Sequence, residues 1–195
     1  MSSTNIAWAS PHYWGNEERY VLDALQSSWI SGGAYVDRLE RDFANYCESP
    51  HVVAASNGTT ALHLAYLAID LRPGDEVIVP GFGFMAAANV ALHMGAKPVF
   101  SEVDGATWCM TAEDVEKCFT PKTKAIVPIH TYGNVCDMHS IIALADSRGV
   151  SVIEDAAEAI GSKYSGKMAG TIAPLGVYSF HATKTITTGE GGAVA

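Results

Sequence analysis

The chain has 195 residues, 48% of them hydrophobic, which is enough to bury the core of one ordinary folded domain. Its 12 lysines and arginines against 21 aspartates and glutamates give a net charge of -9, which argues against nucleic acid and anionic membrane surfaces as partners. The four cysteines have no CxxC spacing, so we expect neither a metal site nor a disulfide framework.

From the amino terminus onward, the chain shows no leader pattern and no apolar run of the ~18 residues that a membrane span needs. We therefore expect a cytoplasmic protein. Apolar runs of strand length alternate with stretches of helical period. The expected helices cover residues 16–27, 35–47, 58–68, 84–94, 112–119 and 138–148. The expected strands cover residues 51–55, 76–79, 98–103, 124–129, 150–154 and 176–180.

This alternation predicts an α/β fold, with a mostly parallel sheet sandwiched by helices. In the first helix, Tyr20, Val21 and Leu25 are expected to face the core. No linker is visible, so residues 1–195 are expected to form one domain. The chain stops at 191–195, where another apolar strand begins, and we expect it to be the front part of a longer polypeptide.

Small and hydroxylated residues follow the first expected strand, in the sequence SNGTTAL at 56–62. Gly58 and Thr59 open the next helix, where backbone N–H groups and the positive end of the helix dipole suit a phosphate. The same residues also suit an ordinary helix cap. The segment alone leaves both interpretations open.

Aromatic and histidine side chains follow two further strands. Phe82 and Phe84 come after strand 76–79, where one of them could stack on a cofactor ring or belong to the core. His130 follows strand 124–129 and could line the same opening. A hydrogen-bonded residue in the wall of that opening is a simpler interpretation of His130 than a catalytic residue.

An acidic pair and a lysine complete the candidate chemistry. Glu154 and Asp155 close a strand at the sheet edge where α/β proteins place ligands, although such acids also serve as caps or metal ligands. Lys184 lies beyond the last expected strand. A lysine at a strand end with a carboxylate on a neighbouring strand suits Schiff-base chemistry with pyridoxal phosphate (PLP). The alternative is a solvated surface lysine.

Six stretches resemble, in family order, signatures of the PLP-dependent sugar-nucleotide aminotransferases, the DegT/StrS group. They are WISG at 29–32, SNGTTALHLA at 56–65, EVIVPGFGF at 76–84, IVPIHTYGN at 126–134, EDAAEAIGS at 154–162 and SFHATKTITTGEGG at 179–192. The resemblance covers nearly the whole chain and implies the aspartate aminotransferase-type fold, known as fold type I. Within the group, residues 15–17, Glu158 and the TITTGEGG ending look most like the perosamine synthases.

The resemblance implies roles for the residues at matching positions. Lys184 would bond to the cofactor aldehyde, and Asp155 would pair with the ring nitrogen. The other implied cofactor contacts are phosphate ligands, a stacking ring and a group facing the ring hydroxyl: Gly58, Thr59 and Ser179; Phe84; and Glu158. The implied substrate contacts are Trp29, Ser31 and His181. Glu158 stands where many relatives carry Gln.

The activity implied by the resemblance is transfer of the amino group of glutamate to a nucleotide-linked 4-keto-6-deoxy sugar, for polysaccharide or O-antigen synthesis. Lysine rather than histidine at position 184 favours transamination over dehydration. The resemblance also implies a homodimer with a shared active site, and a small C-terminal domain that this chain lacks. Two alternatives stay open: an inactive fragment or assembly subunit, and another reaction of fold type I PLP enzymes.

Overall fold

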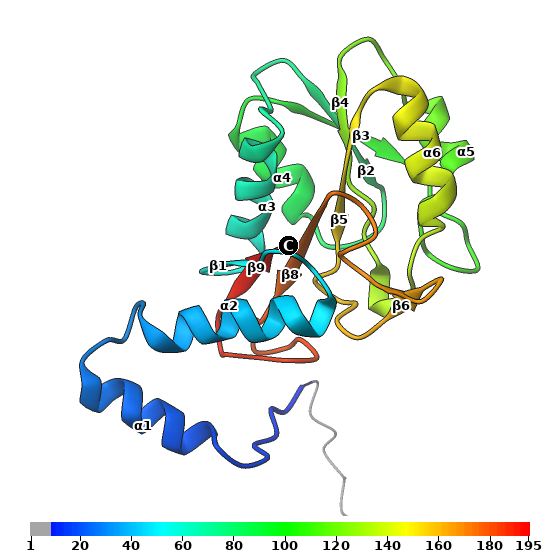
Figure 1. Ribbon diagram of the computed structural model, residues 1–195. Helices are drawn as coiled ribbons and strands as arrows, with labels where there is room; N and C mark the ends of the chain where they lie inside the picture. Colours follow the sequence, from blue (N-terminus) through cyan, green and yellow to red (C-terminus); the bar gives the residue numbers. More distant parts are fainter. Residues whose placement is uncertain (1–8) are drawn as a thin grey trace, which may run out of the picture.

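The computed structural model describes residues 9–195 (Figure 1). Its helices are α1 (Glu17–Ser27), α2 (Ala34–Cys47), α3 (Gly58–Ala68), α4 (Ala86–His93), α5 (Ala112–Lys117) and α6 (Met138–Arg148), with a 3-10 turn at Thr131–Gly133. Its strands are β1 (Val53–Ala55), β2 (Glu76–Pro80), β3 (Lys97–Ser101), β4 (Thr123–Ile126), β5 (Ser151–Asp155), β6 (Lys163–Tyr164), β7 (Lys167–Met168), β8 (Leu175–Ser179) and β9 (Gly192–Val194).

Seven strands form one sheet in the order β1-β9-β8-β5-β4-β2-β3. The neighbours from β8 to β3 pair in parallel, whereas β9 runs antiparallel to both β1 and β8. The expected α/β fold with a mostly parallel sheet is therefore confirmed. The small hairpin β6-β7 surrounds the Ser165-Gly166 turn and stands apart from the sheet.

Alternate residues of the central strands pack on opposite faces of the sheet, as the pleat requires. Val77 and Val79 of β2 join a core cluster that includes residues of α3 and α4. Ile78, between them, joins a cluster that includes residues of α5 and α6. Figure 1 shows these two helix pairs on either side of the sheet. Burial on both faces explains why these strands are continuous apolar runs.

The first helix does not pack as the sequence pattern predicts. No residue of α1 is buried, and Val21 and Leu25 are 60% and 58% exposed. In Figure 1, α1 projects away from the sheet. Tyr20 is half-buried against Tyr35 of α2, with 5.5 Å between the ring centres, but none of the three residues reaches the core. The expected inward position of Tyr20, Val21 and Leu25 is therefore wrong, because an amphipathic pattern identifies an apolar side but not what covers it.

Within residues 9–195, no helix is both long and apolar enough to span a membrane. Residues 1–8, on which the prediction of no leader segment partly rests, lie outside the described part of the chain.

Helix α3 begins at a complete capping box. The Asn57 side chain accepts from the Thr60 N–H at 2.9 Å, and the Thr60 hydroxyl accepts from the Asn57 N–H at 3.1 Å. We expect Asn57→Ala to lower the free energy of unfolding by about 1 kcal/mol, because it removes this acceptor. Urea unfolding measures the change. Asn57→Ser retains a capping oxygen and should lose much less; equal losses in both variants would contradict the capping role.

Candidate active site

A cavity of about 410 Å³ opens beyond the carboxyl ends of the parallel strands. This edge of the sheet is where strands β2, β5 and β8 end and where β1 turns into α3. Open α/β sheets bind ligands at such an edge. Eight of the ten predicted site residues line the cavity: Gly58, Thr59, Phe84, Asp155, Glu158, Ser179, His181 and Lys184. Trp29 and Ser31 do not.

Lys184 extends from the segment after β8 and is largely buried, with 18% of its side chain exposed. Its backbone N–H donates to the His181 carbonyl at 2.9 Å, which forms a turn. Its Nζ lies 3.4 Å from Glu158 Oε1 and 6.0 Å from the centre of the Phe84 ring. The carboxylate and the aromatic face together hold the amine at the cavity wall. Lys184 is therefore not a solvated surface lysine.

Asp155 is the last residue of β5 and is 3% exposed. Burial raises the pKa of its carboxyl group, and this is only partly offset by the Ala157 N–H, which donates to Oδ1 at 3.1 Å. Within residues 9–195 the carboxylate forms no ion pair within 4 Å, although it lines the cavity. A positively charged N–H group of a ligand would therefore complete its electrostatic environment.

The start of α3 and the end of β8 form the third part of the cavity. Gly58 sits so close to Ser179 that an added Cβ would lie 3.0 Å from the Ser179 Cβ. The first N–H groups of a helix lack acceptors within the helix, and the Asn57 cap takes the N–H of Thr60. Gly58, Thr59 and the Ser179 hydroxyl therefore present donors suited to an anion at the positive end of α3.

His181 is held by two neighbours beside this anion site. Its Nδ1 lies 3.0 Å from the Thr183 hydroxyl, and its Nε2 lies 3.7 Å from Glu190 Oε1. Sequence reasoning did not single out Glu190, which lines the cavity. Glycines flank Glu190, and nothing in this local pattern indicates that its carboxylate faces His181.

The predicted position of His130 at the cavity opening is wrong. His130 is fully buried and does not line the cavity. Trp29 and Ser31 lie in the connection between α1 and α2, where Trp29 is 70% exposed. Their role as substrate contacts stays a prediction, since the structure does not bring them to the cavity.

The model of the DegT/DnrJ/EryC1/StrS aminotransferase family matches residues 13–195. The chain belongs to this family. Among curated members of the DegT/DnrJ/EryC1/StrS family, the GDP-perosamine synthase of Caulobacter vibrioides is 46% identical over 190 residues, covering 97% of this chain and 51% of that protein. The GDP-perosamine synthase of Escherichia coli O157:H7 is 48% identical over 185 residues, covering 94% of this chain and 51% of that protein.

A putative sugar aminotransferase from Streptococcus pneumoniae, solved in its PLP form, superposes with a TM-score of 0.94 at 33% identity. The match covers 98% of this chain and 53% of that one. This likeness confirms the expected fold type I architecture of the family member described here. The chain spans about half the length of the curated relatives it matches.

Proposed function

We propose that this chain carries the cofactor-binding and catalytic core of a PLP-dependent nucleotide-sugar aminotransferase. The observation that carries the proposal is the arrangement around one cavity of a largely buried lysine, a buried unpaired carboxylate and an anion site: Lys184, Asp155, and Gly58 with Ser179. Family membership supports the assignment.

The cavity residues fit pyridoxal phosphate by the chemistry of their side chains. Gly58, Thr59 and Ser179 would hold its phosphate, and Asp155 would face its ring nitrogen. Phe84 would lie against the ring, and Glu158 would face the ring hydroxyl. When bound, PLP supplies an aldehyde that takes up amino groups and a ring that stabilises negative charge on the adjoining carbon.

Three residues of the chain then have distinct tasks. Lys184 Nζ would be the nucleophile for the cofactor aldehyde, with loss of water, and, once displaced by a substrate amine, it would be placed to move a proton as a general base. Glu158, 3.4 Å from that Nζ, holds the amine in place while it carries a positive charge. Asp155 would favour a protonated ring nitrogen, because a cationic partner would offset the cost of burying its carboxylate.

The proposed substrates follow from the relatives. The relatives named GDP-perosamine synthase, at 46% and 48% identity, support a nucleotide-linked sugar as substrate. A 4-keto-6-deoxy sugar as the acceptor and glutamate as the donor are proposed on the resemblance of the sequence motifs. Trp29, Ser31 and His181 are the proposed substrate contacts. His181 lines the cavity, whereas Trp29 and Ser31 would need the shared active site of a homodimer to reach the substrate. We include that homodimer in the proposal.

An absorption spectrum tests the cofactor assignment directly. The purified chain, titrated with PLP, should develop a visible band that borohydride abolishes, because borohydride reduces the bond between the lysine and the cofactor. Turnover of GDP-4-keto-6-deoxymannose with glutamate tests the substrates in a second step. Activity only with a UDP-linked or dTDP-linked sugar would refute the perosamine-type acceptor, and the absence of the band would refute the cofactor role.

Gly58→Val is expected to weaken PLP binding by about tenfold or more, because the new side chain meets Ser179 where the phosphate would bind. Equilibrium titration of the absorption band measures the dissociation constant. Gly74→Val is a matched control, since nothing lies within 4 Å of a Cβ there, although its positive φ of 91° adds strain. Equal weakening in both variants would show that strain or stability, and not the anion site, accounts for the loss.

A further inference from the structure

A second polar cluster lies behind the cavity, and the proposed reaction does not use it. His130 and Glu154 are both fully buried, and His130 Nε2 lies 3.0 Å from Glu154 Oε2. Burying two such groups is costly unless their hydrogen bonds are complete. Their partners therefore indicate what the pair does.

Glu154 receives four donors, two at each oxygen. Oε1 accepts from the N–H groups of Ile172 and Ala173, both at 2.6 Å. Oε2 accepts from the Gly170 N–H at 2.8 Å and from His130. A carboxylate is an acceptor at both oxygens, so it matches this set, whereas the amide of glutamine offers one acceptor oxygen and would oppose two donors with its NH₂ group.

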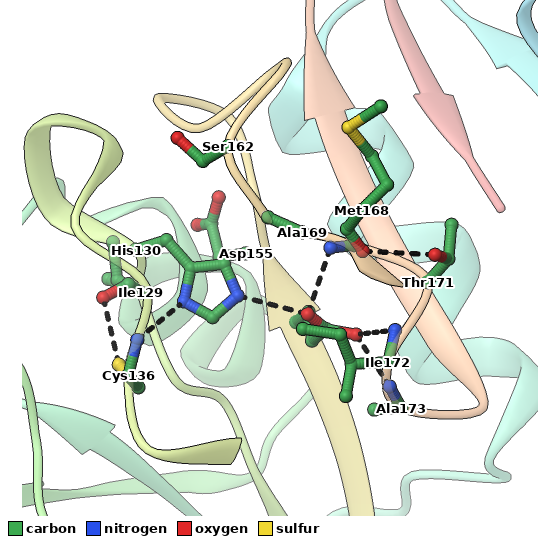
Figure 2. Close-up of polar contacts among 12 residues, drawn as sticks. Ile129, His130, Cys136, Asp155, Ser162, Met168, Ala169, Thr171, Ile172 and Ala173 are labelled. Carbon is green, nitrogen blue, oxygen red and sulfur yellow. Dashed lines mark hydrogen bonds and ion pairs between the residues drawn. The ribbon is translucent and has the colours of Figure 1, made fainter. Parts of the chain in front are cut away.

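The hydrogen bonds of His130 also fix its tautomer. The Cys136 N–H lies 3.3 Å from Nδ1, so Nδ1 is the acceptor and the proton is on Nε2, where it is donated to Glu154. Figure 2 shows Cys136 at one nitrogen of the His130 ring. Both ring nitrogens are occupied and the ring is shielded from the cavity, so His130 is placed for positioning and not for proton transfer.

The backbone connects this pair to Asp155. The His130 N–H donates to the Asp155 carbonyl at 3.0 Å, and the Asp155 N–H donates to the Pro128 carbonyl at 2.9 Å. Glu154 and Asp155 are consecutive in β5, so their side chains point to opposite faces of the sheet. The hydrogen bonds of Glu154 on one face of the sheet therefore hold the same stretch of backbone from which the Asp155 side chain reaches the cavity on the other face.

We propose that His130 and Glu154 form a positioning pair that fixes the end of β5, and with it the Asp155 carboxylate, at the cavity. The pair acts through backbone hydrogen bonds and through the anchored segment 170–173. This inference rests on the proposed function for the role of Asp155, but the position of Asp155 can be measured without cofactor.

Two substitutions of His130 separate its two hydrogen bonds. His130→Asn retains an acceptor near the Cys136 N–H but is too short to reach Glu154. His130→Gln retains a donor that can reach Glu154. The first readout is hydrogen exchange in the protein without PLP, at the Ala157 N–H, which donates to Asp155 Oδ1. The second readout is the circular dichroism of bound PLP, which reports how firmly the ring is oriented.

We expect His130→Asn to raise Ala157 exchange about tenfold or more relative to amides of β2, and to reduce the circular dichroism per bound cofactor. His130→Gln should stay close to wild type in both. Tyr178→Phe is the matched control: it removes a buried hydrogen bond, from Tyr178 Oη to the Ala169 carbonyl at 2.8 Å, one residue before segment 170–173 and without touching Glu154 or His130. It should lower stability without changing either readout.

The proposal is overturned if His130→Asn leaves both readouts unchanged, or if Tyr178→Phe changes them equally, because the pair would then be merely structural. Glu154→Asp, which withdraws the same carboxylate, replaces His130→Asn if that variant does not fold. A wild-type protein that shows no cofactor band refutes the proposed function, whereas the exchange of Ala157 still decides whether the pair positions Asp155.

Discussion

Lys184→Ala is expected to abolish the borohydride-sensitive band and to lower the rate of transamination by about a hundredfold to ten-thousandfold. The magnitude follows from the loss of a positioned acid–base group, because Lys184 Nζ is the amine that lines the cavity beside Phe84 and Glu158. PLP should still bind, since the anion site at Gly58 and Ser179 is unchanged. The spectrum should then resemble free PLP held without a covalent bond.

Two controls define what this result means. Lys163→Ala removes an exposed lysine in the β6-β7 hairpin and should leave the band and the activity unchanged. Lys184→Arg retains the positive charge next to Glu158, but its guanidinium stays protonated and cannot act as the nucleophile, so it should resemble Lys184→Ala. An intact band in either variant at position 184 would exclude this lysine as the bonding residue.

The sequence predicts most of the fold because its signals are local. Helices α3 and α6 have the predicted bounds, since Asn57 and Asp137 cap their starts and Gly149, in the left-handed region, ends α6. Strand ends differ by up to three residues, because pairing with neighbours, rather than composition, decides where a strand stops. The side chains of α1 escape prediction, since covering an apolar face is a long-range property.

Some parts of the site could be predicted from the sequence, and others could not. Gly58, Asp155 and Lys184 follow strands whose parallel arrangement was itself predictable, so their meeting at one edge follows from the fold class. The role of His130 could not be predicted, because its partner, Glu154, is 24 residues away. The backbone N–H groups that bind Glu154 come from residues 170–173, which are further still along the chain. The local sequence shows a histidine after a strand but not the four donors that converge on one carboxylate.

Asp155→Asn is expected to have opposite effects on stability and on activity. Burial raises the pKa of the Asp155 carboxyl group above its value in the unfolded chain. The contribution of this group to stability is therefore complete below the ordinary aspartate pKa and is lost as the pH rises through the raised pKa. Above the ordinary aspartate pKa, folding without cofactor must either bury the charge of Asp155, which has no ion-pair partner within residues 9–195, or keep a proton on it, and both cost free energy.

Asparagine retains the shape and can accept the Ala157 N–H without a charge to desolvate. In the absence of PLP, Asp155→Asn should therefore raise the melting temperature near neutral pH, and the gain should shrink as the pH falls below the ordinary aspartate range. Scanning calorimetry across pH measures both trends. A gain that is independent of pH would show that packing, and not the ionisation of Asp155, is responsible.

With PLP and substrates present, Asp155→Asn should be less active than wild type. The amide cannot hold a proton on the ring nitrogen by opposing charge, so transamination should fall by about a hundredfold or more, while the covalent band from Lys184 persists. The cofactor should also raise the melting temperature of wild type more than that of Asp155→Asn, since a ligand stabilises in proportion to its affinity for the folded state. Because stability without cofactor and activity with it move in opposite directions, general damage to the fold cannot produce this combination. The buried Asp155 carboxyl group thus lowers the stability of the protein without cofactor and contributes favourably only when a cationic partner enters the cavity.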